Sequence, residues 1–353
     1  MCAEPGAGSA EPGQPVIALD IGGTKIAGAV LDLATLDTHG AGETTVLRQT
    51  PTPAQRGGPT VLRHVVSLAG QLANEARERG DEPGSIAVAS AGVVDPATGA
   101  ITHATRLLPG WAGTALAAEL TQHTGLPCTV LNDVHAHGVG EASLGAGRGA
   151  RRVLVVTVGT GLGAALVDDG VPQQGSHGVA GHLGHVCVPE AAGLRCSCGR
   201  QGHVEAVASG SGVAAAYARR VGLPDDAAGV DAAEVSRRAG TGEPAAIEVL
   251  ATAGRALGRA IGMALNVCDP DRVVIGGSLC RAPQPWWDGI EAGVEHEAMD
   301  AVVHTQRVRS QLGPEAALWG AAIYAARGTA AQRHWPPAQA SLLGAPVHRS
   351  QDS

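Results

Sequence analysis

The feature that most constrains this chain is a pair of glycine-rich hairpins that lie far apart in the sequence. The first spans 16–31, where two buried-strand patterns flank the turn Ile21-Gly-Gly-Thr-Lys25. The second spans 152–167, where two more strand patterns flank Gly159-Thr-Gly-Leu-Gly163. The tip of such a hairpin exposes backbone N–H groups that can hold a phosphate, although a single glycine-rich turn is also an ordinary hairpin turn. The pair predicts a two-sided phosphate clamp. It is not a Walker A loop, because Gly-x-x-x-x-Gly-Lys-[Ser/Thr] is absent.

A second feature, the pair Asn132-Asp133, lies between the two hairpins. It directly follows the strand pattern of 128–131 and opens the helix pattern of 134–144. In open α/β sheets ligands gather at the carboxyl ends of strands, which makes this pair a candidate for chemistry. Asn or Asp at this place is also the ordinary helix cap, and the local pattern by itself favours the cap by about two to one.

The stretch 181–205 gathers side chains that bind metals, namely His185, Cys196, Cys198 and His203. Zinc takes such ligands tetrahedrally, and a site filled by four protein ligands is structural rather than catalytic. Cys196 and Cys198 are too close in sequence for a relaxed disulfide, and no secretion signal accompanies them. The alternative is a glycine-rich loop with incidental polar residues. Cys-x-Cys is not the usual zinc-finger spacing, so the spacing alone gives zinc roughly even odds.

Composition limits the classes of function. The 353 residues suffice for two domains or one large one, and 44% are hydrophobic, so a sizeable core is available. There is no Phe and only 2% aromatic residues, so this core must consist of Ala, Val, Leu and Ile. The formal net charge of −8 argues against a nucleic-acid surface. Because no apolar run is long enough to span a bilayer and no signal peptide is seen, we expect a cytoplasmic protein without a membrane partner.

Periodicity places helices and strands between these motifs. Apolar positions three and four residues apart predict helices, and short apolar runs predict strands. The predicted helices are 60–79, 116–125, 134–144, 204–221, 244–267, 283–299 and 314–326, and the further strands are 85–90, 128–131 and 272–275. The expected organisation is a disordered leader over 1–14, an N-terminal α/β domain over 15–131, a C-terminal α/β domain over 132–312, a helix over 313–327 and a flexible tail over 328–353.

These motifs resemble those of the ROK group of sugar kinases, whose pattern is Gly-Glu-x-Gly-His followed by Cys-x-Cys-Gly-x-x-Gly-Cys-x-Glu. The chain departs from this pattern at His203, where the group usually has its third cysteine, and at His182, where it has a glutamate that contacts the sugar. The first change exchanges one zinc ligand for another, whereas the second leaves the identity of the substrate open. The resemblance extends from about Val16 to Arg327. The matching positions are Gly181, Gly184, His185, Cys196, Cys198, Gly199, Gly202 and Glu205.

The resemblance implies an α/β, two-domain actin-like ATPase fold (sugar kinase/Hsp70/actin) with a zinc-stabilised loop, in which the helix over 313–327 packs back on the first domain. It also implies ATP, Mg²⁺ and structural Zn²⁺ as cofactors, a sugar or sugar-like substrate, and a homodimer. Asp133 is then the general base, Asn132 grips a sugar hydroxyl, and Asp20 faces the magnesium through water. The other implied substrate contacts are Gly92, His182, His185 and Glu205. The other implied ATP contacts are Gly22, Gly23, Thr24, Lys25, Gly159, Thr160, Gly161, Gly163, Gly276 and Gly277.

Three functions compete. An ATP-dependent kinase that phosphorylates the primary hydroxyl of a hexose or hexose-like substrate is favoured. Many members of the group are instead transcriptional repressors with a helix-turn-helix before the first hairpin, whereas only about fifteen residues precede Val16 here. A regulator without a DNA-binding domain and a catalytically idle zinc-binding scaffold are the other two. The group also includes kinases of C7-cyclitols, and the exchange at His182 makes a cyclitol or a modified sugar the alternative substrate.

Overall fold

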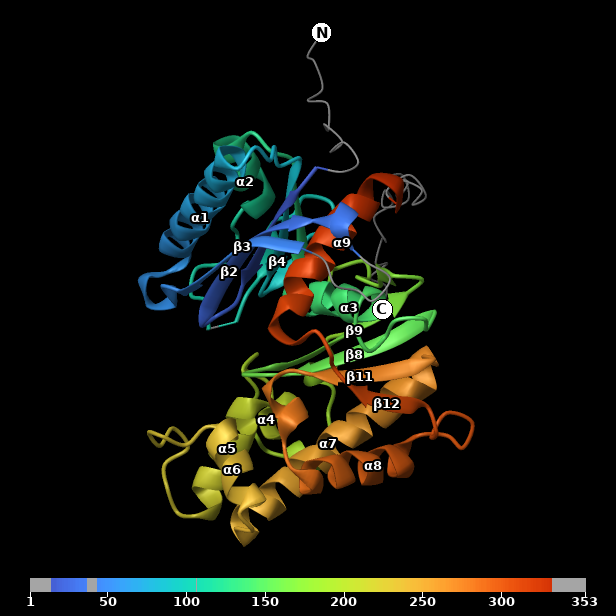
Figure 1. Ribbon diagram of the computed structural model, residues 1–353. Helices are drawn as coiled ribbons and strands as arrows, with labels where there is room; N and C mark the ends of the chain where they lie inside the picture. Colours follow the sequence, from blue (N-terminus) through green and yellow to red (C-terminus); the bar gives the residue numbers. More distant parts are fainter. Residues whose placement is uncertain (1–13, 37–42, 106, 332–353) are drawn as a thin grey trace, which may run out of the picture.

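The computed structural model describes residues 14–36, 43–105 and 107–331 of the chain (Figure 1). The leader predicted over 1–14 and most of the tail predicted over 328–353 lie outside these ranges. The tail prediction is wrong at its start, because helix α9 (Ala316–Ala331) continues past residue 328. Alanine has the highest helix propensity, so this Ala-rich sequence extends the helix through Gly328. None of the helices in the described ranges has the length and apolar character that a membrane crossing requires.

The first of two five-stranded sheets is mixed and has the order β3-β2-β1-β4-β7. β1 pairs antiparallel with β2 through the first glycine turn and parallel with β4, which pairs parallel with β7. The sequence did not predict β3, because its mostly polar residues are typical of an edge strand and carry no clear alternation. The strands are β1 (Val16–Ile21), β2 (Lys25–Asp32), β3 (Glu43–Pro51), β4 (Ser85–Ser90) and β7 (Cys128–Asn132), with a separate small pair β5 (Val93–Val94) and β6 (Ile101–His103).

Side-chain size divides the two faces of this sheet. Successive side chains of a strand point to opposite faces, and along β1 the large Ile17 and Leu19 alternate with the smaller Val16 and Ala18. The large side chains pack with α1 and α2, and the small ones pack with α9 and α3. Because alanine occupies little volume, α9 and α3 approach their face closely. These helices are α1 (Gly58–Glu78), α2 (Leu116–Thr124) and α3 (Asp133–Ser143).

The second five-stranded sheet has the order β10-β9-β8-β11-β12. β8 and β9 form the second glycine hairpin, and β11 lies parallel to β8 and to β12. The helices α4 to α8, in the lower part of Figure 1, cover one face, and α3 packs on the other. The strands are β8 (Arg152–Val158), β9 (Leu162–Asp168), β10 (Val171–Pro172), β11 (Arg272–Gly276) and β12 (Gln306–Arg309). The helices are α4 (Glu205–Ala208), α5 (Gly210–Arg220), α6 (Ala232–Gly240), α7 (Pro244–Cys268) and α8 (Gln284–Glu297).

Helix α3 lies between the two sheets, so the residues at its N-terminus stand where the two halves of the molecule meet (Figure 1). Glycines allow its close crossing with α9. A Cβ on Gly320 would lie 1.7 Å from the carbonyl oxygen of Ala136, and a Cβ on Gly140 would lie 2.1 Å from that of Ala316. The crossing therefore tolerates no side chain at either position, and it joins α9 firmly to α3.

The helix predicted over 204–221 is wrong as a single helix. The chain is broken into α4 and α5, and Ser209 between them caps α5 by accepting a bond from Gly212 N at 3.1 Å. Gly210 N donates to the carbonyl oxygen of Gly159 at 2.8 Å, in the second glycine turn. This long-range bond outweighs the local helical pattern. The remaining predicted helices are confirmed in position.

We propose that the two sheets are the cores of the two predicted domains, 15–131 and 132–312. The strands of the first sheet lie between residues 16 and 132, and those of the second lie between 152 and 309. Helix α9 follows the second sheet in sequence but packs on the first, which is the place expected for the helix predicted over 313–327.

Candidate functional site

Backbone hydrogen bonds shape the first glycine turn. Gly22 N donates to the carbonyl oxygen of Lys25 at 2.9 Å and closes the turn between β1 and β2. Thr52, which follows β3, donates from Oγ1 to the carbonyl of Gly22 at 2.7 Å and from its N–H to that of Thr24 at 3.0 Å. Among the described residues, the N–H groups of Gly23 and Thr24 have no acceptor, so they can face a phosphate. No pattern in the sequence indicates Thr52, because its role depends on β3, which was not predicted.

Two charged side chains flank this turn. Lys25 is the one lysine in the sequence, against 24 arginines. An ammonium group is a compact point charge and is not interchangeable with a guanidinium group, so a single lysine at this turn is a further sequence signal for phosphate. The pKa of Asp20 is raised to about 7, chiefly by burial and also by the nearby Asp133, against the opposing effect of Lys25. The repulsion between these two carboxyl groups therefore favours a positive charge between them.

The second glycine turn is held by the start of α5. Gly159 N donates to the carbonyl of Gly161 at 3.0 Å, and Ser211 Oγ donates to that of Thr160 at 2.8 Å. Gly163 lies outside the turn, in β9, where it pairs with Thr157. A Cβ on Gly163 would lie 2.9 Å from Cγ2 of Val134 in α3, so close packing accounts for this glycine without a phosphate.

A third glycine turn ends β11 beside the second hairpin. Gly277 has a φ of +85°, and a Cβ there would lie 2.3 Å from the carbonyl oxygen of Val158, the last residue of β8. Only glycine fits these two conditions. The neighbouring Gly276 packs against His137 of α3, whose Nε2 would lie 3.0 Å from an added Cβ. Gly276 and Gly277 therefore lie at the end of the second sheet that also carries the second glycine turn.

Asn132 and Asp133 occupy the carboxyl end of β7 and the start of α3. Asn132 Oδ1 accepts from the N–H groups of Val134 at 3.0 Å and His135 at 3.2 Å, so Asn132 is the N-cap of the helix. Its Nδ2 donates to Asp133 Oδ1 at 2.9 Å and to the carbonyl of Gly92 at 3.0 Å. Both hydrogens of this amide are thus engaged, one by Gly92 and the other by Asp133.

The environment of Asp133 suits a base. Burial raises the pKa of this carboxyl, while the bond from Val134 N at 2.9 Å and the charge of His182 lower it. The net shift is upward, which makes the carboxylate more basic than that of a solvated aspartate. Because Asp133 also raises the pKa of Asp20, these three side chains interact within one cluster.

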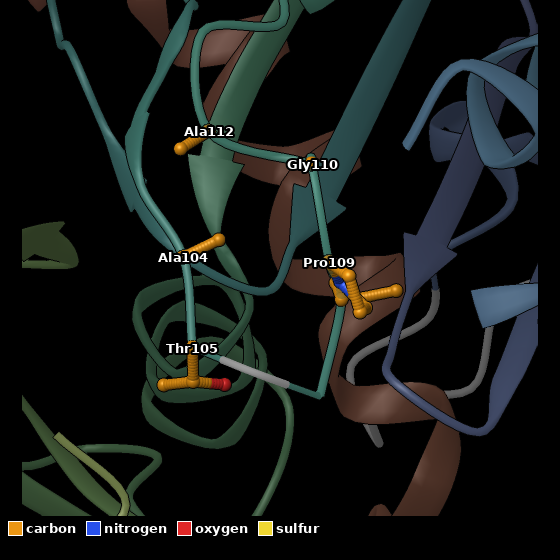
Figure 2. A pocket seen from close by; sticks show the side chains of 6 residues that line it. Ala104, Thr105, Pro109, Gly110 and Ala112 are labelled. Atoms are coloured by element: carbon orange, nitrogen blue, oxygen red, sulfur yellow. The ribbon is translucent and has the colours of Figure 1, made fainter. Parts of the chain in front are cut away.

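A cavity of about 420 Å³ lies beside the loop that follows β6, as Figure 2 shows. Gly92 lies between this loop and Asn132. Its φ is +103°, and a Cβ on it would lie 2.7 Å from the carbonyl oxygen of His103. The carbonyl oxygen of Gly92 accepts a hydrogen bond from Asn132. Leu107 of the same loop lies against Gly23, because a Cβ added to Gly23 would lie 3.3 Å from the Cβ of Leu107. The loop therefore borders both the first glycine turn and the Asn132-Asp133 pair. The cavity is lined by Ala104, Thr105, Leu108, Pro109, Gly110 and Ala112.

The remaining expected substrate contacts form a path from Asp133 to the second glycine turn. His182 precedes the 3-10 helix Leu183–His185, and its ring centroid is 6.1 Å from that of His185. Glu205, at the start of α4, accepts from Leu162 N at 3.1 Å and from Ser197 Oγ at 2.5 Å. Glu205 therefore ties the second hairpin to the loop that carries the metal-binding side chains.

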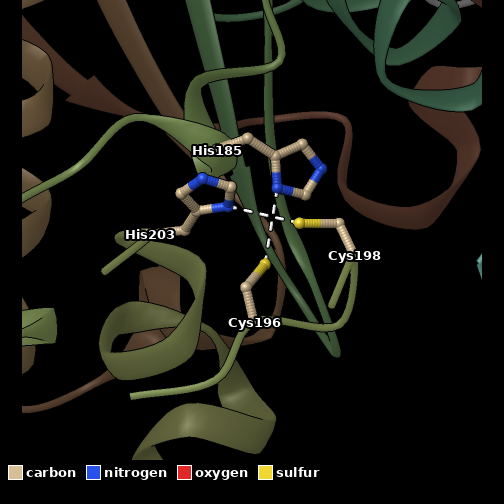
Figure 3. A group of neighbouring side chains, drawn as sticks. All are labelled: His185, Cys196, Cys198 and His203. Atoms are coloured by element: carbon tan, nitrogen blue, oxygen red, sulfur yellow. Dashed lines mark hydrogen bonds between the residues drawn. The ribbon is translucent and has the colours of Figure 1, made fainter. Parts of the chain in front are cut away.

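Figure 3 shows these metal-binding side chains converging on one point. His185, Cys196, Cys198 and His203 offer ligand atoms that all lie within 4.8 Å of one another. Cys196 Sγ is 3.5 Å from His185 Nδ1, and Cys198 Sγ is 3.3 Å from His203 Nδ1. Tetrahedral zinc with bonds of about 2.0–2.3 Å sets its ligand atoms about 3.5 Å apart, so the cluster has the dimensions of a zinc site. Cys187 is exposed and lies outside the cluster.

Two sheets that each carry a glycine turn, joined by the helix that begins at Asp133, define the actin-like ATPase class of fold. The chain belongs to the ROK family, whose profile matches residues 16–327. Over 315 residues it is 31% identical to the glucokinase of Halalkalibacterium halodurans, and the aligned region covers 86% of this chain and 92% of that protein. Over 309 residues it is 32% identical to the N-acetylmannosamine kinase of Salmonella newport, and the aligned region covers 88% of this chain and 97% of that protein. Since the two relatives are named for different sugars, overall identity does not select a substrate.

Solved structures of two kinds resemble the chain. A ROK family glucokinase from Streptomyces griseus in complex with glucose and AMPPNP is 27% identical and superposes with a TM-score of 0.72, covering 88% of this chain and 98% of that one. A ROK family transcriptional regulator, a homologue of the MLC protein of E. coli, is 25% identical with a TM-score of 0.76, covering 89% and 78%. The fold is thus common to both kinds, and individual residues must separate them.

Proposed function

We propose that the protein is an ATP-dependent kinase that phosphorylates the primary hydroxyl of a hexose or a hexose-like substrate. The observation that carries the proposal is Asp133, a carboxyl group of raised pKa at the junction of the two sheets, oriented by the amide of Asn132. The two kinases among its relatives and the glucokinase that holds glucose and AMPPNP support this function.

The mechanism assigns the base to Asp133. Phosphoryl transfer requires alignment and charge neutralisation, with little covalent help from the protein. Asp133 Oδ1 is held by Asn132 Nδ2 and Val134 N, each at 2.9 Å, which leaves Oδ2 to accept the proton of the substrate hydroxyl. The hydroxyl oxygen then attacks the γ-phosphorus, and ADP leaves.

The two glycine turns would hold the triphosphate from opposite sides. Gly23 and Thr24 offer free N–H groups on one side, together with the charge of Lys25, and the 159–161 turn provides the other. Gly276 and Gly277, at the end of β11, would receive the adenosine. Magnesium bound to the triphosphate supplies charge neutralisation. Asp20, with a pKa of about 7 beside Asp133, is the side chain placed to hold water ligands of that ion.

We also propose that His185, Cys196, Cys198 and His203 hold one structural zinc. His185 directs Nδ1 at the cluster, which leaves Nε2 for the substrate side. The role of the ion would be to fix the loop between the 3-10 helix and α4, because this loop positions His185 and Glu205. Its contribution to catalysis is then indirect.

The nature of the substrate depends on His182. A carboxylate at this place, as in the ROK pattern, offers only acceptors, whereas a neutral imidazole offers one donor and one acceptor. We therefore propose that glucose is a poor substrate and that a modified sugar or a C7-cyclitol is preferred. The kcat/KM for glucose in His182→Glu tests this. One restored hydrogen bond predicts a rise of about 5- to 100-fold, and an unchanged or lower value would show that His182 does not set specificity.

The kinase function itself is tested by a coupled assay of ADP release across hexoses, N-acetylhexosamines and C7-cyclitols. We expect ADP release that requires both a sugar or cyclitol and Mg²⁺. A panel without any substrate-dependent ADP release would contradict the proposal.

A sugar-responsive regulator is the second candidate, and the likeness to the solved ROK regulator favours it. The same panel separates the two functions when thermal unfolding is measured beside it. A regulator is stabilised by its sugar without releasing ADP, whereas the kinase is stabilised and also turns over.

A further inference from the structure

The segment 174–182 forms a strap that runs from α9 to His182. At its start, Gln174 Nε2 donates to Tyr324 OH in α9 at 2.8 Å, and Ala180 N donates back to the carbonyl of Gln174 at 3.0 Å. Between them the strap passes against the first half of the molecule, because a Cβ on Gly178 would lie 2.4 Å from the carbonyl oxygen of Val94 in β5. The strap therefore contacts both halves of the molecule and ends at His182, beside Asp133.

The other end of the strap is held by α3. His135, in the first turn of this helix, is 1% exposed, and its Nε2 lies 2.8 Å from the carbonyl oxygen of Ala180. A carbonyl oxygen only accepts, so Nε2 carries the hydrogen. Burial lowers the pKa of His135 and favours the neutral ring, whereas the bond to Ala180 raises this pKa. Ala164 N adds a bond to the carbonyl of Gly181 at 2.8 Å.

This anchor links the base to the residue that faces the substrate. His135 follows Asp133 by two residues on the same helix, and its N–H donates to the capping oxygen of Asn132 at 3.2 Å. Its ring holds Ala180, which precedes His182 by two residues. A short path of covalent and hydrogen bonds thus fixes the position of His182 relative to Asp133.

We propose that His135 is a positioning residue for the sugar, which holds the strap so that His182 stands at a fixed place beside Asp133. The proposal rests on the proposed kinase function, since it concerns the substrate side of the same site. It predicts that the loss of the His135 donor weakens sugar binding and leaves ATP binding unaffected, because the ATP site is assigned to the glycine turns and not to the strap.

Two variants at His135 give a matched comparison. His135→Leu fills a similar volume without a donor, and His135→Gln retains an N–H donor at a similar reach. We expect His135→Leu to raise the KM and the Kd of the sugar about 5- to 50-fold, the range for a buried carbonyl left without its donor. The KM for ATP should stay within about twofold. His135→Gln should restore most of the affinity for the sugar, which a purely structural defect would not allow.

A double-mutant cycle with His182→Ala tests the coupling itself. If His135 acts through His182, the effect of His135→Leu on the sugar disappears in the His182→Ala background. Additive effects, or equal losses for sugar and ATP, would overturn the proposal. Should His135→Leu fail to fold, Tyr324→Phe releases the strap at its other end and should weaken the sugar in the same direction, again without affecting ATP.

The probes are glucose and N-acetylmannosamine, with Kd measured by calorimetry and KM by ADP release. A wild-type protein that binds a probe but releases ADP with no member of the substrate panel would contradict the kinase function, and the cycle on Kd would still decide the role of His135. An absence of binding for both probes, with C7-cyclitols also inactive, would overturn both proposals.

Discussion

At the scale of single residues, the helix cap and the proposed catalytic base are not alternatives, because they fall on the adjacent residues Asn132 and Asp133. The local pattern favoured the cap, and the cap exists, but it is Asn132 that makes it. Asp133 receives the remaining hydrogen of the same amide and is left with one free carboxylate oxygen among the described residues. The local pattern could nominate both residues, and the resemblance named Asp133 as the base. Neither could assign the cap to Asn132 rather than Asp133, because that assignment depends on the side-chain geometry.

The raised pKa of Asp133 predicts a pH dependence of activity. A base acts only when deprotonated, so kcat/KM should fall as the pH falls through this pKa, at a higher pH than the value of about 3.9 of a solvated aspartate. His182→Ala should move this acid limb further up, since the charge of His182 lowers the pKa of Asp133. The measurement is the profile of kcat/KM against pH in both proteins. An acid limb within the ordinary aspartate range would argue against Asp133 as the base.

Because Lys25 is the one lysine in the chain, its reactivity reports on the phosphate site directly. An amine-acetylating reagent should modify Lys25, and MgATP at about ten times its Kd should slow the reaction about tenfold. Peptide mass spectrometry separates this site from the N-terminal amine, and Lys25→Arg provides the blank. Modification at the same rate with and without MgATP would remove Lys25 from the ATP site.

At the scale of elements, the sequence predicts the helices and strands that a local apolar pattern determines. It fails for elements whose boundaries depend on contacts with distant residues. The long helices α1 and α7 follow their apolar spacing and were found where expected. The predicted helix over 204–221 is broken at Ser209, because Gly210 bonds to the second glycine turn. The edge strands β3 and β12 were not predicted from the sequence, because they contain few apolar residues.

The crossing of α3 and α9 predicts a large cost for one methyl group. In Gly320→Ala the new Cβ would lie 1.7 Å from the carbonyl oxygen of Ala136, so the helices must separate. We expect a loss of about 2–3 kcal/mol or more in the free energy of unfolding. Gly70→Ala in α1 is the matched control, because its Cβ meets nothing within 4 Å and should be neutral or stabilising by up to about 1 kcal/mol. Equal stabilities in urea would contradict the close packing of the crossing.

The loop between the 3-10 helix and α4 predicts one tightly held zinc per chain. Cys198→Ser should lose the metal, because it removes one of the four ligands. Cys187→Ser should keep it, although Cys187 is only two residues from His185. Metal analysis of protein purified without added zinc measures the ratio. A metal-free protein that is folded and fully active would contradict a structural zinc.

At the scale of the whole molecule, the repeated glycine hairpin predicted two related halves, and each of the two five-stranded sheets contains one of the hairpins. What the sequence did not reveal is how the halves are connected. Helix α3 packs on both sheets, α9 returns across it, and the strap 174–182 ties α9 to the site through Gln174 and His135. These connections depend on close packing and on single long-range hydrogen bonds, which leave no periodic trace in a sequence.

The central claim is that Asp133 is the base of a phosphoryl transfer to a sugar-like alcohol. The most direct measurement is turnover of the best substrate of the panel by Asp133→Asn, with ATP binding and thermal unfolding as controls. Both controls should be unchanged, since asparagine keeps the oxygen that accepts from Asn132 and Val134. The account predicts that kcat falls by a factor of about 10² to 10⁴. A variant that keeps more than about a tenth of wild-type turnover would contradict it.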